Sequence, residues 1–295
     1  MVTSDKVSKL LAGSIDSHVH SGPGLIPRSL DHVQAARDAI AAGMRAIVVK
    51  DQHSMTCNAI YFIQNYILKD APLDVFGGMV LNNATGGINP HTVDGAIKSG
   101  AKIIWMPTAS AENHIETHKK IHTDFPKTKE KLIDEIPLKI IDKNGNLLPQ
   151  ITQICSLIAE ADIILGTGHL YLKEIKLLVD EAKRQGVKKI LMQHPEFLIN
   201  ATIDDMIDFA NKGVFIEHSM VFYVKGTIEK EYLLEMIKKV GAERTVLGSD
   251  LGQMGNPSPI EGIRSCIKIM LEMGISDEEI DLMLRRNPAK LLDLA

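Results

Sequence analysis

Short runs rich in valine, isoleucine and leucine alternate with amphipathic segments along this chain of 295 residues, and this alternation constrains the fold most. Dense apolar runs of this length are typical of strands that are covered on both faces, as in parallel sheets. Eight strands are predicted, at residues 13–20, 46–53, 74–82, 101–107, 162–169, 188–195, 213–220 and 244–250. Helices are predicted between them, at residues 30–42, 90–99, 171–185, 202–212 and 228–240.

Glycine stands directly after each of these five helices, where a left-handed cap is commonly needed. The glycines are Gly43, Gly100, Gly186, Gly213 and Gly241. Eight strand-helix units in succession predict an α/β fold, a (β/α)8 TIM barrel, with residues 1–295 forming a single domain. An open doubly wound sheet is the alternative, but no glycine-rich nucleotide-binding fingerprint follows the first strand.

Two stretches depart from the strand-helix rhythm. Residues 108–150 are too long for one loop and predict a lid-like insertion at the barrel mouth after strand 4. Within it, Asn144 and Gly145 lie between apolar runs and favour a tight hairpin. Residues 276–295 open with Ser276 and Glu279, a capping-box pair, and predict closing helices that pack under the barrel.

The composition limits which binding partners and which cellular compartment are expected. A net charge of −4 does not favour nucleic acid or an anionic membrane as a partner. The three scattered cysteines, Cys57, Cys155 and Cys266, are typical of buried thiols in a reducing compartment. The chain shows neither a secretory signal nor an apolar run of membrane-span length. We therefore expect a cytoplasmic protein that acts on a small molecule, and association into homo-oligomers stays open.

Histidines gather at the predicted strand ends, and an aspartate ends the last strand. In a parallel barrel all strand carboxyl ends open to the same mouth, so these side chains are expected to converge. His18 and His20 are two residues apart on one strand and can both point inward. Imidazole and carboxylate ligands with an open position for water suit a catalytic metal. Six histidines lie at predicted strand ends: His18, His20, His53, His169, His194 and His218. Four such histidines and Asp250 could hold one or two divalent ions, with zinc as the first candidate and manganese or iron as alternatives.

Asp250 has a second predicted role at this site. A carboxylate beside a metal-bound water can take its proton and later pass that proton to a leaving group. We therefore expect Asp250 to be a catalytic residue as well as a ligand.

The strand-end pattern resembles the amidohydrolase superfamily. Asp16-x-His18-x-His20, then His169, His194 and Asp250 at the ends of strands 5, 6 and 8, is similar to its metal constellation. The terminal "NPAKLLDL" (287–294) resembles its common tail, and "VVKDQH", "GGINP", "WMPT" and "TGH" resemble its DUF6282 branch more closely. The resemblance implies the barrel, metal ligands at His18, His20, His169, His194 and Asp250, and Asp250 as the proton shuttle, but no substrate.

One departure from the superfamily pattern concerns the number of metal ions. Members with two ions usually carry a bridging lysine carbamate or glutamate, most often on strand 4, and "IIWMPT" (103–108) has neither at its end. Lys50, at the end of strand 2, is the alternative candidate, because a buried neutral amine can add CO₂ and become an anionic ligand. A charged lysine that holds a substrate carboxylate is an equal interpretation.

Several residues near the strand ends are candidate substrate contacts: Arg28, His53, Asn82, Thr108 and His218. Arg28 follows strand 1, where a guanidinium can clamp a carboxylate or phosphate, or can be a surface loop charge. Glu217 and His218 are neighbours on strand 7, so only one of them can face inward. His114, His118 and His122 are four residues apart, and we expect them on the solvated face of a lysine-rich helix.

The function expected from these residues is metal-dependent hydrolysis of an amide, cyclic amide, ester or lactone of a small molecule. A phosphoesterase fits the same machinery. The alternative enzyme is a metal-dependent lyase, a decarboxylase or hydratase, in which Arg28 or Lys50 binds a small carboxylic acid. A catalytically inactive, ligand-binding barrel is the alternative that is not an enzyme.

Overall fold

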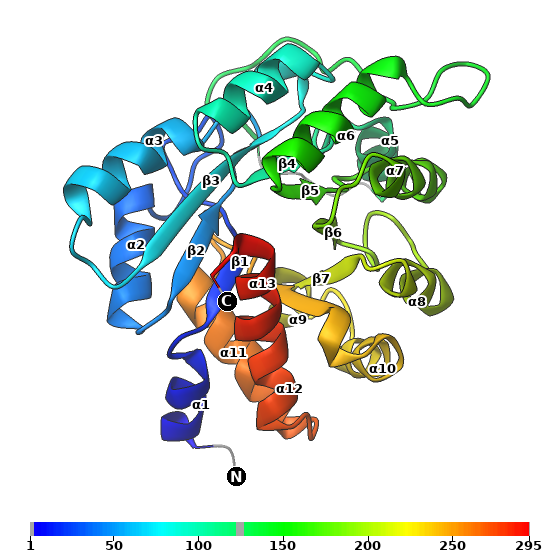
Figure 1. The fold of residues 1–295 in the computed structure, drawn as a ribbon. Coiled ribbons are helices and arrows are strands. Elements are labelled where there is room, and N and C mark those ends of the chain that lie inside the picture. Colours follow the sequence, from blue (N-terminus) through cyan, green and yellow to red (C-terminus); the bar gives the residue numbers. More distant parts are fainter. Residues whose placement is uncertain (1–2, 122–126, 295) are drawn as a thin grey trace.

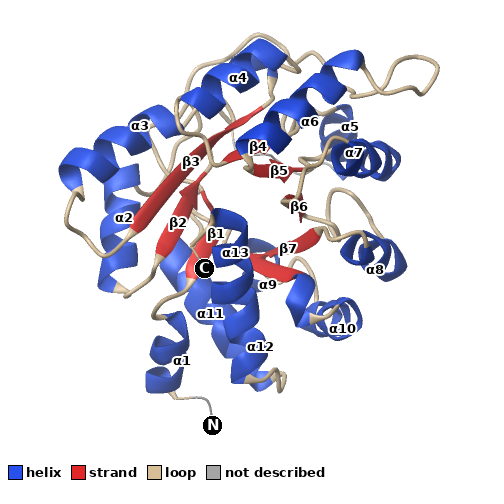
Figure 2. Ribbon diagram, in the orientation of Figure 1, coloured by secondary structure: helices blue, strands red, loops and turns tan. Residues whose placement is uncertain are grey.

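The computed structural model describes residues 3–121 and 127–294. Eight parallel strands are hydrogen-bonded in the order in which they occur in the chain, with helices around them (Figures 1 and 2). The predicted (β/α)8 barrel is confirmed. The strands are β1 (Ile15–Val19), β2 (Ala46–Val49), β3 (Asp74–Val80), β4 (Ile103–Trp105), β5 (Ile164–Gly166), β6 (Ile190–Gln193), β7 (Phe215–Ser219) and β8 (Thr245–Gly248).

Each strand lies inside its predicted range and is shorter, mostly because it ends before the last residues of that range. The main helices are α1 (Ser4–Leu11), α2 (His32–Ala41), α3 (Cys57–Phe62), α4 (Pro90–Lys98), α5 (Glu112–Ile121), α6 (Pro149–Ala161), α7 (Leu172–Arg184), α8 (Ile203–Asn211), α9 (Met220–Val224), α10 (Lys230–Val240) and α11 (Pro259–Glu272). Side-chain caps begin several of them, as at Asp31, Asn89, Thr202 and Ser258. No helix within the described ranges is long and apolar enough to cross a membrane.

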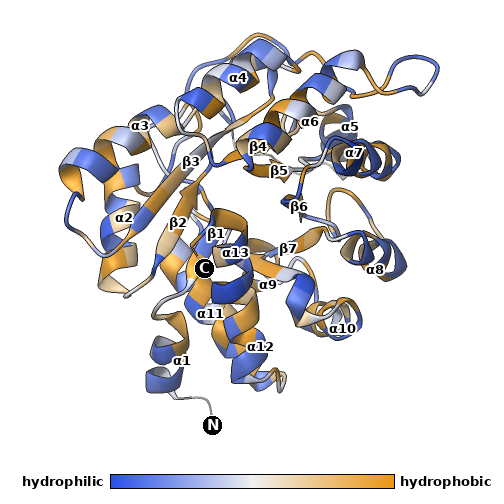
Figure 3. Cartoon of the chain, viewed as in Figure 1, coloured by the Kyte–Doolittle hydropathy of each residue, from blue (hydrophilic) through white to orange (hydrophobic). Residues whose placement is uncertain are grey.

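Apolar side chains form two layers, one between the strands and the helices and one inside the barrel. Figure 3 shows the hydrophobic colour running along the strands. The inner layer includes Val48, Ile103 and Trp105, and Leu291 and Leu292 pack against it from below. These leucines belong to the tail, which forms α12 (Asp277–Asp281), the π-helix η4 (Leu282–Arg286) and α13 (Asn287–Leu292). The tail therefore closes the barrel floor, as predicted.

The insertion after β4 is also present. Its hairpin turns at Gly145, which has a φ of 85°, and the backbone N–H of Asp142 donates to the carbonyl of Asn146. An antiparallel bridge joins Ile141 and Leu147 just outside this turn. The earlier half of the insertion forms α5, which runs beside the barrel mouth.

The barrel closes between its first and last strands by contacts at and just past their carboxyl ends. The N–H of Asp250 donates to the carbonyl of His18, and the N–H of His20 donates to that of Leu251, both at 2.8 Å. The buried carboxylate of Asp16 accepts from the N–H groups of His18 and Ser249. This seam brings the polar ends of β1 and β8 together.

Candidate metal centre

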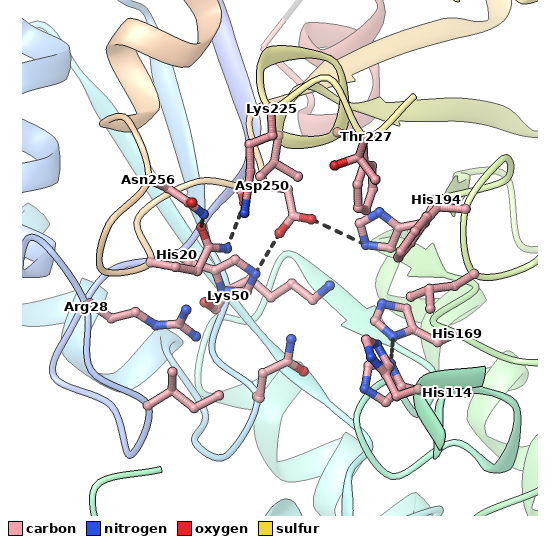
Figure 4. A pocket seen from close by; sticks show the side chains of 18 residues that line it. His20, Arg28, Lys50, His114, His169, His194, Lys225, Thr227, Asp250 and Asn256 are labelled. Atoms are coloured by element: carbon pink, nitrogen blue, oxygen red, sulfur yellow. Dashed lines mark hydrogen bonds and ion pairs between the residues drawn. The ribbon is translucent and has the colours of Figure 1, made fainter. Parts of the chain in front are cut away.

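A cavity of about 270 Å³ opens at the carboxyl ends of the strands. Four of the five predicted metal ligands line it: His20, His169, His194 and Asp250 (Figure 4). His18, which is buried, lies beside them, with its ring centroid 5.2 Å from that of His20 and 5.4 Å from that of His194. The structure thus brings all five predicted ligands to one mouth, although they span more than two hundred positions of the chain.

Asp250 reaches the imidazoles of three histidines. Its Oδ1 is 3.0 Å from Nε2 of His20 and 3.4 Å from Nε2 of His18, and its Oδ2 is 3.8 Å from Nε2 of His194. Two ligand atoms bound to one tetrahedral zinc ion are about 3.4 Å apart, since each metal–ligand bond is roughly 2.1 Å long. The spacing of His18, His20 and Asp250 therefore fits a single metal ion.

The tautomer of His20 follows from its surroundings. Its Nδ1 lies 2.9 Å from the backbone carbonyl of Lys50, which can only accept, so Nδ1 carries the hydrogen. Nε2 then presents a lone pair to the carboxylate of Asp250. Two acceptors at this distance repel each other unless a cation or proton lies between them. Burial lowers the pKa of His20 to about 4, so the proton is absent at neutral pH and a cation fits the gap.

His18 is oriented by a carboxylate that lies deeper in the barrel. Its Nδ1 is 2.7 Å from Oε1 of Glu217, whose Oε2 accepts from the hydroxyl of Ser17 at 2.8 Å. The ammonium of Lys50 donates to Nε2 of His18 at 3.1 Å, so Nδ1 carries the hydrogen and donates to Glu217. A carboxylate behind a ligating imidazole is the usual support of a metal site. Sequence reasoning left open which of Glu217 and His218 faces inward, and the structure selects Glu217.

Burial keeps the histidines of the cluster neutral, the form that binds metals. It lowers the pKa of His18 to about 3 and that of His194 to about 4. It also lowers the pKa of His169, well below the usual range. The same burial raises the pKa of Glu217 to about 7.

The amino group of Lys50 lies within this cluster of histidines. Its side chain is 1 % exposed, and Nζ lies 5.3 Å from the ring centroid of Trp105. Burial lowers its pKa to about 8, which brings the neutral amine within reach near neutral pH. Both predicted roles, a carbamate ligand and a charged lysine at the cavity wall, are compatible with this place.

His169 has one ring nitrogen that is free to bind an ion. Its Nδ1 is 2.9 Å from Nδ1 of His114, whereas its Nε2 is buried with no hydrogen-bond partner among the described residues. Its ring lies 4.9 Å from that of His194, measured between centroids, and Nδ1 of His194 contacts the hydroxyl of Ser219 at 2.9 Å. A buried orphan nitrogen beside a second imidazole fits a further ligand position.

His114 lies at the cavity, not on a solvated helix face, so the prediction for this residue was wrong. The amide of Asn113 donates to the carbonyls of His169, Leu170 and Leu198 and fixes the start of α5 against the barrel. His114 is therefore buried, and half-buried His118 also lines the cavity. His122 lies outside the described residues.

Three other predicted substrate contacts lie beside the cavity and do not line it. The carboxylate of Asp51 accepts from the N–H groups of His53 and Ser54, and this turn places Gln52, not His53, in the cavity wall. The amide of Asn82 donates to Gln52 and Thr108 and accepts from the N–H of Thr108. Asn82 and Thr108 therefore tie neighbouring loops together and support the wall.

His218 faces away from the barrel interior, because strand neighbours alternate and Glu217 points inward. It is fully buried, and its Nδ1 lies 3.2 Å from both carboxylate oxygens of Glu196. The hydroxyl of Tyr223 donates to the same carboxylate. In place of the predicted substrate contact, His218 makes this hydrogen-bonded contact with Glu196 outside the strands. Arg28 does line the cavity.

The fold and the site together define a class: (β/α)8 barrels with a histidine and aspartate cluster at the carboxyl mouth. Within it, this chain belongs to the family described as "Family of unknown function (DUF6282)", whose pattern matches residues 13–217. This membership confirms the narrower resemblance seen in the sequence. No curated protein matches the chain.

Solved structures of three differently named enzymes share the fold. An amidohydrolase from Pseudomonas aeruginosa has a TM-score of 0.65 at 12 % identity, over 99 % of this chain and 98 % of that one. An organophosphorus hydrolase from Deinococcus radiodurans has a TM-score of 0.59 at 14 % identity, over 97 % and 93 %. A 2,6-dihydroxybenzoate decarboxylase from Rhizobium has a TM-score of 0.53 at 13 % identity, over 96 % and 99 %. At these identities the likeness concerns the fold.

Proposed function

We propose that this protein is a metal-dependent hydrolase of the amidohydrolase type that cleaves an amide, cyclic amide, ester or lactone of a small molecule. The observation that carries the proposal is the set of lone pairs directed at one point. Nε2 of His18, Nε2 of His20 and the carboxylate of Asp250 lie at ligand spacing, and each imidazole donates its other nitrogen's hydrogen to a fixed acceptor.

The chain would hold its metal with His18, His20 and Asp250, and with His169 and His194 as the remaining ligands. A nitrogen-rich ligand set favours zinc, with manganese and iron as alternatives. A second ion requires a further anionic ligand, and Lys50 as a carbamate is the candidate for it. A bound divalent ion would polarise the scissile bond and lower the pKa of water at the site.

The chain's own residues supply orientation and proton transfer. Glu217 and the carbonyl of Lys50 fix the rings of His18 and His20, and the seam between β1 and β8 fixes Asp250. Asp250 is the group placed to take a proton from the attacking water and return it to the leaving group, because its carboxylate reaches into the cavity. The cavity volume of about 270 Å³ suits a small-molecule substrate.

A metal-dependent lyase is the second candidate. The observation in its favour is the pair of cationic side chains, Arg28 and Lys50, in the wall of the same cavity. Such groups would hold the carboxylate of a decarboxylase or hydratase substrate. The decarboxylase from Rhizobium shows that this barrel fold carries such a reaction in another protein.

Metal analysis of the purified protein tests the proposal, with His18→Ala, Asp250→Asn and the exposed-site control His91→Ala beside the wild type. We expect about one or two equivalents of a divalent metal in the wild type and in His91→Ala, and a clear loss in His18→Ala. About two equivalents would also support a carbamate at Lys50. If no metal binds, even after reconstitution with zinc, manganese and iron in turn, the hydrolase is excluded and the ligand-binding barrel remains.

A further inference from the structure

The cavity carries a positive charge that the chain as a whole does not. Among the described residues that line it, Arg28, Lys50 and Lys225 are basic and Asp250 is the one carboxylate. The whole chain has a net charge of −4. A cleft lined by one sign of charge concentrates ligands of the opposite sign. The occupant of this cavity is therefore expected to be an anion.

Arg28 is the basic residue with the strongest need for a partner. Its side chain lies partly buried in the loop after β1, and its Nε is buried without a hydrogen-bond partner. No carboxylate of the described residues forms an ion pair with its guanidinium. The nearby carboxylate of Asp51 accepts backbone N–H groups on Oδ1 alone; its Oδ2 is buried without a hydrogen-bond partner among the described residues and forms no ion pair with Arg28.

A guanidinium offers five N–H donors in a planar fork, and removing it from water without a partner is costly. Nothing in the described part of the chain uses these donors in a hydrogen bond. The loop nevertheless holds Arg28 at the cavity, because an antiparallel bridge joins its backbone to Gln253. We therefore expect the guanidinium of Arg28 to find its hydrogen-bond partner in the bound ligand.

Aromatic rings line the side of the cavity opposite Arg28, next to His194. In Figure 4, Arg28 lies on one side of the cavity, and His169 and His194 lie on the other. Phe222 packs edge-on against His194, with ring centroids 5.6 Å apart. The ring of Phe197 lies 4.4 Å from that of Phe222, and both line the cavity. A ligand that spans the cavity thus meets a cation at one end and aromatic rings at the other.

We infer that the substrate is a small organic acid whose carboxylate binds Arg28 and whose apolar body lies against Phe197 and Phe222. This inference rests on the proposed function and deepens it, since the bond to be broken would lie between these two ends, beside His20 and Asp250. The planar fork of a guanidinium matches the two oxygens of a carboxylate with two parallel hydrogen bonds.

Equilibrium binding tests the inference without any turnover. Benzoate, neutral benzamide and phenyl phosphate are titrated by calorimetry into the purified wild-type protein, Arg28→Gln, Arg28→Lys and the control Arg37→Gln. Arg37 is exposed on α2 and does not line the cavity. We expect benzoate to bind the wild type and Arg37→Gln equally, and to bind Arg28→Gln about ten- to a hundredfold more weakly. Arg28→Lys should fall between them, because it keeps the charge and loses the fork.

Two further comparisons locate the ligand. Benzamide should bind the wild type at least about tenfold more weakly than benzoate and be insensitive to Arg28→Gln. Phe222→Ala should weaken benzoate and leave acetate unchanged. Benzoate binding that is absent, or that is the same in Arg28→Gln and wild type, would overturn the inference, as would tighter Arg28-dependent binding of phenyl phosphate. Metal content, measured on the same samples, separates this result from the fate of the proposed hydrolase.

Discussion

At the scale of single residues, the candidate ligands are held in place by the groups behind them. Glu217 is buried and accepts a hydrogen bond from His18 on one carboxylate oxygen and from Ser17 on the other. A carboxylate in this place fixes the ring and increases the basicity of the nitrogen that faces the cavity. Glu217 is therefore a positioning residue, because it acts on the site through His18.

Replacement of Glu217 by glutamine should weaken metal binding about tenfold or more, because a neutral amide supports an imidazole ligand less well. Competition with a chromogenic chelator measures this affinity. Glu235→Gln, on the exposed face of α10, is the matched control and should behave as the wild type. Equal metal affinity in Glu217→Gln and wild type would show that the carboxylate does not support the ligand.

Sequence reasoning placed the five candidate ligands at one mouth but found few of the groups that support them. His18 and His20 were accessible to prediction because strand side chains alternate, and this rule needs no knowledge of the rest of the chain. The contact between His18 and Glu217 joins residues 199 positions apart. His114 was missed because three hydrogen bonds from Asn113, not helix periodicity, decide which way α5 faces.

At the scale of elements, the loop after β8 determines the geometry of the site. Gly252 has a φ of 121°, and a Cβ atom added to it would lie 1.5 Å from the carbonyl oxygen of His20. The loop can approach the end of β1 this closely only without a side chain. Strand and helix positions followed from periodicity and caps, but this close approach has no periodic signal in the sequence.

Alanine at Gly252 should therefore destabilise the protein more than alanine at Gly255, which lies in the same loop. Gly255 also has a positive φ, of 80°, but an added Cβ would meet no heavy atom within 4 Å. Gly255→Ala should lose only the roughly 1–2 kcal/mol that a left-handed alanine costs. Guanidinium unfolding of both variants measures the difference, and equal losses would mean that the loop moves away from His20 without cost.

At the scale of the whole molecule, the barrel is held shut at its two ends by different means. The seam between β1 and β8 closes the functional mouth, and the tail closes the floor. Asn287, at the start of α13, is buried and donates to the carbonyls of Ala242 and Thr245, both at 2.7 Å. These bonds attach the tail to the start of β8.

Asn287→Ala should lower the free energy of unfolding by about 1–3 kcal/mol, because it leaves two buried carbonyls without a donor. Thermal or urea unfolding measures the loss. Asn211→Ala, at an exposed position on α8, should change stability by no more than about 0.5 kcal/mol. If Asn287→Ala is as stable as Asn211→Ala, the hydrogen bonds of Asn287 do not contribute and apolar contacts alone hold the tail.

The backbone conformation at His194 and Asp250 limits which substitutions these two positions tolerate. Both residues have a φ of 52°, a left-handed conformation that Asn, Asp and Gly adopt readily and β-branched residues do not. A single-base change of Asp250 to Asn or Gly would remove the carboxylate and leave the loop intact. A single-base change to Val would remove the carboxylate and also distort the loop. If the proposed hydrolase and its acid substrate are correct, a related chain with Asn or Gly at this position is expected to bind the acid without cleaving it.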